Sequence, residues 1–241
     1  MVGFGTIINV AGIIIGGILG RVAGRFLSER YQDSLSKACG ISVLFIGIAG
    51  VLEEMMTVSE SQIVSGKSML IVVCLTLGAL TGEFFNLENG IEKFGEWLKI
   101  KTGNAKEKSF VEGFVTASLT VCIGAMAIVG SIEDGIFGDY SILATKAVLD
   151  LVIVLVMTCS LGKGCAFSAI PVAVFQGTIT VLAKFIKPLM AEAALSNLSL
   201  IGSILIFCVG INLVWGKKIR VANFLPAIIV AVMVAFLPVG I

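Results

Sequence analysis

The chain has 241 residues, of which 57% are hydrophobic and only 14% are charged, and its net charge is +1. Soluble domains carry about 25% charged residues, so this composition excludes an ordinary soluble protein and predicts one embedded in a lipid bilayer. The even charge balance gives no reason to expect a nucleic-acid partner. There is no histidine, the commonest general base and metal ligand, and the six cysteines form no CxxC pair. We therefore expect no cofactor and no resident metal.

Eight apolar stretches approach the roughly 20 residues that a helix needs to cross a bilayer. They are residues 4–20, 38–55, 68–86, 110–131, 142–162, 165–186, 195–214 and 223–240. The sequence therefore predicts an all-α, polytopic bundle of transmembrane helices that forms a single integral membrane domain over residues 1–241. Residues 1–135 would hold four spans and two cytoplasmic amphipathic linkers, and residues 136–241 would hold four spans with short connections.

The basic residues predict how the chain is oriented. Of the 17 lysines and arginines, 13 follow the first, third, fifth or seventh span. Loops rich in lysine and arginine stay in the cytoplasm, so both termini are predicted to lie outside it.

The first span contains glycines at Gly12, Gly16 and Gly20. A spacing of four places them on one helix face, where another backbone can approach closely. This face could pack against a helix of the same chain, line a pore or moving surface, or join two copies into a homo-oligomer. Asn9 lies in the same span, where it needs a partner and could supply a carbonyl oxygen to a site.

The third span repeats part of this pattern at an offset of 62 residues. Gly78 and Gly82 are followed by Glu83. In the first span, Gly16 and Gly20 are followed in the same way by Arg21. A polar linker with an apolar stripe follows each span, which is typical of a helix lying on the membrane surface. The stripes are formed by Leu27, Tyr31 and Leu35, and by Ile91, Phe94 and Leu98. We interpret the pattern as a parallel internal repeat in the first half. Arg21 and Glu83 could form an ion pair across the repeat axis, or each could extend separately toward the membrane surface.

The fourth span carries Glu112, Thr116 and Thr120 at a spacing of four, so these polar residues share one face. The threonine hydroxyls could bond to their own backbone, or the three side chains could line a hydrated path. Residues 131–135 are expected to form an acidic outer turn, which either attracts cations or is simply solvated.

The fifth span, 142–162, carries Lys146 and Asp150 one helical turn apart. Its eleven Ile, Leu and Val residues favour insertion by about 3–7 kcal/mol in sum, while the two charges cost about 2.5–3.5 kcal/mol each. Neighbouring helices or water must therefore satisfy the charges. Asp150 could hold a cation or a proton with Lys146 as its counter-charge, or Lys146 could contact an anion. Alternatively the two form a structural pair, with Lys146 reaching toward the outer surface.

The sixth span carries Pro171 and Gln176 at membrane depth. Proline leaves a backbone carbonyl without its helical donor, so we expect a kink or break there, and broken helices often mark transport sites. Asn212 in the seventh span is a further candidate. Pro226 falls in the first turns of the eighth span, where a proline initiates a helix.

Several segments resemble one bacterial family. They are TASLTVCIGAMAIVGSIEDG (116–135), TKAVLD (145–150), FSAIPVAVFQGTIT (167–180), VGINL (209–213) and KIRVANFLPA (218–227). Together with the glycine-rich opening, they resemble the YdfK/YqgA-type family of uncharacterised multi-pass inner-membrane proteins. The resemblance implies a bacterial cytoplasmic-membrane protein, and it brings no substrate and no catalytic residue.

Two functions fit these observations. The first is a transporter or channel for a small ion or solute, with its site near Lys146, Asp150 and Pro171. The second is a non-transporting sensor or assembly partner that docks another protein through its cytoplasmic linkers. The sequence has no HExxH, GxSxG or GxGD motif, so we expect no enzyme activity.

Overall fold

A computed structural model describes residues 2–59 and 62–236, and this part of the chain is helical apart from one short hairpin. The α-helices are α1 (Phe4–Gly24), α2 (Glu29–Met55), α3 (Ser68–Phe85), α4 (Leu87–Lys101), α5 (Phe110–Cys122), α6 (Ala125–Phe137), α7 (Ser141–Leu161), α8 (Ala169–Val181), α9 (Ala183–Ile186), α10 (Glu192–Trp215) and α11 (Pro226–Val234). The 3₁₀ helices are η1 (Lys163–Ser168), η2 (Lys187–Leu189) and η3 (Val221–Phe224). Strands β1 (Met56–Ser59) and β2 (Gln62–Ser65) pair antiparallel. The predicted all-α polytopic bundle is confirmed.

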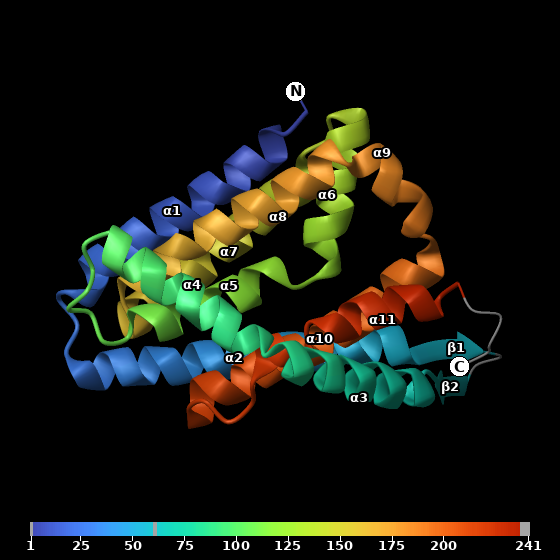
Figure 1. Cartoon of the computed structure of the whole chain (residues 1–241), viewed down its shortest axis with the longest axis horizontal. Helices are drawn as coiled ribbons and strands as arrows, with labels where there is room; N and C mark the ends of the chain where they lie inside the picture. Colours follow the sequence, from blue (N-terminus) through green and yellow to red (C-terminus); the bar gives the residue numbers. More distant parts are fainter. Residues whose placement is uncertain (1, 60–61, 237–241) are drawn as a thin grey trace.

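The long helices are arranged as three close pairs. α1 lies along α7, α2 along α10, and α3 along α11 (Figure 1). The glycine contacts give the directions: Gly12 meets Ala147 and Gly24 meets Cys159, so α1 and α7 run parallel. The other two pairs run antiparallel by the same criterion. Helix α8 packs on α1 beside the α1–α7 pair. Helices α5 and α6 lie between this pair and the other two pairs, α2–α10 and α3–α11.

The glycines of α1 explain how closely α1 and α7 approach. A Cβ built on Gly16 would lie 2.4 Å from the carbonyl oxygen of Leu151, and Gly12 and Gly20 make the same approach one turn before and one turn after. No larger side chain fits such a contact without moving a backbone. This glycine surface is therefore occupied inside one chain.

Gly78 and Gly82 of α3 make a similar approach to the last helices. A Cβ on Gly78 would lie 2.5 Å from the backbone nitrogen of Ala227, and a Cβ on Gly82 would lie 1.8 Å from the carbonyl oxygen of Asn223. Both glycines thus lie against the start of the last apolar helix. The parallel internal repeat itself stays a prediction.

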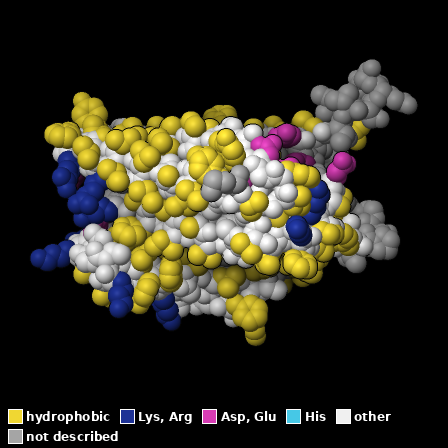
Figure 2. Space-filling model, turned by 90° about the horizontal axis from the view of Figure 1, so that it is seen from above, with side chains coloured by type: hydrophobic (Ala, Val, Ile, Leu, Met, Phe, Trp, Pro, Cys, Tyr) yellow, Lys and Arg dark blue, Asp and Glu magenta, His cyan; other side chains and the backbone are white. Residues whose placement is uncertain are grey.

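Six helices in the described part of the chain are long and apolar enough to cross a membrane, and the bent pair α5–α6 would make a seventh. The helical stretch Val221–Val234 is apolar but shorter. The end of the predicted eighth span, 237–240, lies outside the described residues, so the count of eight stays a prediction. Figure 2 shows a broad apolar surface between one end rich in lysine and arginine and another where carboxylates gather.

The prediction of a separate amphipathic helix in the first linker is wrong. Helix α2 begins at Glu29 and continues without interruption to Met55, because neither glycine nor proline occurs between Glu29 and Cys39 to stop it. The apolar stripe at Tyr31 is therefore part of a long helix. The second linker does form a separate amphipathic helix, α4, on which Phe94 and Trp97 are partly exposed.

The predicted ion pair between Arg21 and Glu83 is also wrong. A carboxylate oxygen of Glu83 lies 2.9 Å from Nη1 of Arg220, and the side chain of Asn223 donates to the other carboxylate oxygen. Arg21 has no ion pair among the described residues. The antiparallel packing of α3 on the chain from residue 221 onward explains this choice of partner.

Candidate functional site

The fourth span is broken in its middle. Helix α5 ends at Cys122, α6 begins at Ala125, and the two axes differ by 62°. The turn requires glycine, because Gly124 has φ 142° and ψ 149°. The last carbonyls of α5 and the first N–H groups of α6 lack intrahelical partners, so a negative and a positive helix end meet at this point.

Pro171 does not break the sixth span as predicted. It is the third residue of α8, which follows the 3₁₀ turn η1, and in the first turn of a helix the missing N–H would have no partner anyway. The irregular backbone lies before the proline, where Gly162 has φ 87°. The break that sequence reasoning assigned to the sixth span belongs to the fourth, where the isolated Gly124 was its only signal.

Lys146 and Asp150 form a buried ion pair on α7. The ammonium nitrogen of Lys146 lies 2.8 and 2.7 Å from the two carboxylate oxygens of Asp150. Only 8% and 4% of the two side chains are exposed. Lys146 therefore does not reach toward the outer surface, and both charges are held inside the bundle.

Two buried carboxamides, one on α1 and one on α8, have their hydrogen-bonding groups unused. Asn9 on α1 and Gln176 on α8 are both 0% exposed, and neither the oxygen nor the nitrogen of either amide has a hydrogen-bond partner among the described residues. Asn9 is within interacting distance of Asp150, though not in good hydrogen-bond geometry.

The packing of α1 against α8 sets Asn9 and Gln176 at about the same level. The hydroxyl oxygens of Thr6 and Thr180 lie 3.4 Å apart at one end of this contact. At the other end, a Cβ on Gly17 would lie 2.3 Å from that of Ala166. The helices thus run antiparallel, and residues 9 and 176 face the same section of the bundle.

The break in the fourth span adjoins the ion pair. Cys122, the last residue of α5, is within electrostatic range of both Lys146 and Asp150. Three elements therefore meet near the pair: α7 with the charges, α1 with Asn9, and the carbonyl end of α5. Gln176 on α8 lies at about the same level as Asn9 along α1. Leaving a buried amide unpaired costs about 1–3 kcal/mol per group. Such groups are retained where water or a ligand completes them.

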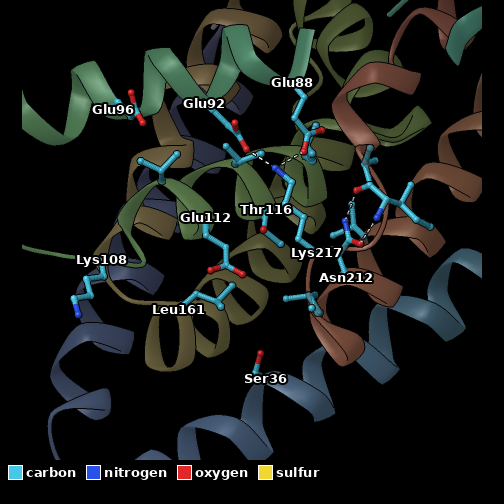
Figure 3. A pocket seen from close by; sticks show the side chains of 18 residues that line it. Ser36, Glu88, Glu92, Glu96, Lys108, Glu112, Thr116, Leu161, Asn212 and Lys217 are labelled. Carbon is cyan, nitrogen blue, oxygen red and sulfur yellow. Dashed lines mark hydrogen bonds and ion pairs between the residues drawn. The ribbon is translucent and has the colours of Figure 1, made fainter. Parts of the chain in front are cut away.

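A cavity of about 530 Å³ opens along the other face of α5 (Figure 3). Glu112 and Thr116 reach into it from α5, and Glu88, Glu92 and Glu96 line it from α4. Thr120 does not line the cavity: it is buried and donates to the carbonyl of Thr116 at 2.8 Å. The deepest α5 residue in the lining is Leu119, one helical turn before Ile123 at the break.

The cavity is acidic. Its lining holds four glutamates against Lys108 and Lys217. Lys217 lies 2.7 Å from Glu88 and also pairs with Glu92. Burial lowers the pKa of Lys217, but the hydrogen bonds and charges of these two glutamates outweigh it and hold that pKa above its usual value. Lys217 is therefore charged at neutral pH, and no ion pair neutralises Glu96 or Glu112 among the described residues.

Asn212 lines the cavity but has a structural task. Its oxygen accepts hydrogen bonds from the backbone N–H groups of Lys218 and Ile219, and its nitrogen donates to the carbonyl of Ile219 at 2.7 Å. The amide thereby shapes the turn after α10, which presents Lys217 to the cavity.

The predicted acidic outer turn is wrong, because residues 131–135 belong to α6. Asp134 is fully buried and accepts hydrogen bonds from the backbone N–H groups of Gly3, at 3.2 Å, and Gly5, at 3.0 Å. It therefore caps the start of α1, where a negative charge also complements the helix dipole. No group of three or more acidic or cysteine residues that could hold a metal occurs within residues 2–59 and 62–236.

Comparison with known proteins gives the family. Residues 4–236 match the family described as "Protein of unknown function (DUF554)". The chain belongs to this family. The chain is similar to "Uncharacterized membrane protein YdfK" of Bacillus subtilis (strain 168), with 29% identity over 233 residues that cover 97% of this chain and 96% of that protein. It is equally similar to "Uncharacterized protein YqgA" of Escherichia coli (strain K12), with 29% identity over 231 residues and 94% of each chain covered.

No solved structure matches the chain. The family resemblance drawn from the sequence segments is confirmed. The DUF554 description states no function, the first relative's name describes a membrane protein, and neither relative's name states a substrate. The function must therefore be argued from the site.

Proposed function

We propose that the protein transports a small ion or polar solute across the bacterial cytoplasmic membrane without chemically changing it. The binding site would comprise Lys146, Asp150, Asn9 and Gln176 beside the α5–α6 break. The observation that carries the proposal is the presence of two fully buried amides without hydrogen-bond partners among the described residues, of which Asn9 is within interacting distance of the buried ion pair.

A purely structural role explains the ion pair but leaves the amides unexplained. A structural pair needs only its two charges, and packing requires no unpaired amide beside them. Charges inside a membrane span, set next to a helix broken near mid-membrane, are the usual composition of a transport site.

The surroundings support access from one side in this conformation. The acidic cavity opens at the end of the bundle where the basic loops lie, which we propose is the cytoplasmic end, and it follows α5 to within one turn of the break. On the other side of the pair, the contact between Thr6 and Thr180 and the cap from Asp134 close the bundle. Alternating access would require the first side to close and the second to open.

The test is solute movement in liposomes that contain the purified protein. Currents and isotope fluxes are recorded after jumps in sodium, potassium, pH, divalent ions, and small amines and carboxylates. We expect one solute to move, and we expect Asp150→Asn and Gln176→Met to abolish or strongly reduce its flux. The matched control is Asp33→Asn, because Asp33 forms a similar pair with Lys37, four residues on, but at an exposed surface.

Flux that survives both site variants would overturn the assignment of the site. Absence of both current and flux for every solute would contradict the transport proposal and favour a sensor or assembly partner, for which co-purifying proteins would then be sought.

A further inference from the structure

We infer that the site binds a monovalent metal cation of about the size of sodium, and that the ammonium group of Lys146 is its tethered competitor for Asp150. The role of this cation in transport rests on the proposed function, but its binding can be measured separately.

The donors gathered at the site are oxygen atoms. The carboxylate of Asp150 offers two, and the side-chain oxygens of Asn9 and Gln176, both without a partner among the described residues, offer one each. The end of α5, whose last carbonyls lack helical donors, is within electrostatic range of Asp150. Carboxylate and carbonyl oxygens suit hard cations, and carbonyl ends of broken membrane helices coordinate sodium in transporters.

The sign of the charge follows from the approach to the site. Four glutamates and two lysines line the cavity along α5, and Glu96 and Glu112 are not neutralised by an ion pair among the described residues. Such a cavity concentrates cations and repels anions. The helix end that adjoins the pair through Cys122 is the carbonyl end of α5, which also favours a positive charge.

The size of the charge follows from burial. The buried site contains one carboxylate, Asp150, and the described residues include no group of three or more His, Cys, Asp or Glu side chains that could hold a metal ion. Uncompensated charge is costly inside a membrane, so a single carboxylate suits one positive charge and not two.

Lys146 already occupies the position of such a cation. Its nitrogen lies 2.8 and 2.7 Å from the two oxygens of Asp150. A metal ion can therefore take the carboxylate only if the ammonium leaves the buried site, because one carboxylate cannot balance both positive charges. If the pair is open in one molecule of ten or fewer, the apparent affinity for the cation falls at least tenfold. Replacing Lys146 by an uncharged residue should therefore raise the apparent affinity for the cation by the same factor.

The experiment measures thermal unfolding of the purified, full-length protein in detergent. Sodium, potassium or lithium chloride is titrated against choline chloride at constant ionic strength and fixed pH. A ligand that binds the folded state raises the melting temperature in a saturable way. We expect this rise with sodium, its loss in Asp150→Asn, and an at least tenfold lower midpoint in Lys146→Met.

Gln176→Met keeps the test valid if a charge variant fails to fold. Its amide has no partner to lose among the described residues, so the protein without cation should melt at the same or a higher temperature, while the response to sodium weakens. Asp33→Asn and Lys37→Met alter the exposed pair of the same spacing, and they should leave the response unchanged.

Three results would overturn the inference: no response of the wild type to any alkali cation, a response unchanged in Asp150→Asn and Gln176→Met, or a response to pH or to the anion alone. If cation binding is absent while liposomes transport another solute, the inference falls and the proposed function stands. If the cation binds at Asp150 but no solute moves, the inference stands and the proposed function falls.

Discussion

Gly16 approaches Leu151 so closely that a Cβ on the glycine would lie 2.4 Å from the leucine carbonyl oxygen. Because the clashing atom belongs to the backbone of α7, a rotamer change cannot relieve it. We expect Gly16→Ala to destabilise the protein by about 1–3 kcal/mol, the usual cost of overpacking a tight contact. Thermal unfolding in detergent measures this loss.

Gly177→Ala is the matched control. Gly177 is also a helical glycine, but a Cβ built there meets no described atom within 4 Å. Replacing glycine by alanine in a helix normally stabilises it by about 0.5–1 kcal/mol. Equal effects of the two substitutions would contradict the close packing of α1 on α7.

The ion pair gives a second prediction. Asp150→Leu leaves Lys146 buried without a partner, and breaking a buried pair in this way costs about 3–5 kcal/mol. The double substitution Lys146→Met with Asp150→Leu should be close to wild type in stability, or up to about 1–4 kcal/mol more stable, while losing transport.

A double-mutant cycle on the melting curves, together with liposome flux, checks this result. A double variant that folds and still transports would show that the pair is only structural. A double variant as unstable as Asp150→Leu would show that the two charges do not compensate one another.

The sequence alone predicts the proximity of Lys146 and Asp150, but it does not predict the position of Asn9 beside them. The spacing of four between Lys146 and Asp150 places both on one face of a helix, so their proximity follows from local geometry alone. That Asn9 lies near Asp150 depends on the register between α1 and α7, which the close contacts of several glycines determine only once the two helices are paired. No pattern within α1 identifies α7 as that partner.

The break at Gly124 was missed for a different reason. An isolated glycine inside an apolar stretch is compatible with a continuous helix. The dihedral angles of Gly124, φ 142° and ψ 149°, go with the packing of α6 on α8 and α7, which the local sequence does not specify. Pro171 gave the stronger local signal, but its place in the first turn of α8 removes the effect expected of it. The local sequence rules thus correctly predicted a broken span, but they assigned the break to the sixth span instead of the fourth.

Asp134 provides a third prediction, because it is the acceptor for two backbone N–H groups at the start of α1. Asp134→Ala should cost about 0.5–2 kcal/mol, as loss of a helix cap does, and the amides of Gly3 and Gly5 should exchange hydrogen faster. Hydrogen exchange followed by mass spectrometry measures this. Glu133→Gln is the control on the same helix, since Glu133 is half-buried and has no ion pair among the described residues.

The last prediction concerns orientation and the acidic cavity. Thr116 is half-buried and lines the cavity, whereas Ser141 is exposed at the start of α7. In a background without the six native cysteines, a membrane-impermeant thiol reagent should label Thr116→Cys only in inverted vesicles and Ser141→Cys only in right-side-out vesicles. The reason is that the 13 basic residues that follow alternate spans predict a cytoplasmic location for the cavity end. Labelling of Ser141→Cys from the cytoplasmic side would reverse the orientation. Thr116→Cys labelled from neither side would mean that the cavity does not admit solvent, and the proposed access route along α5 would then be wrong.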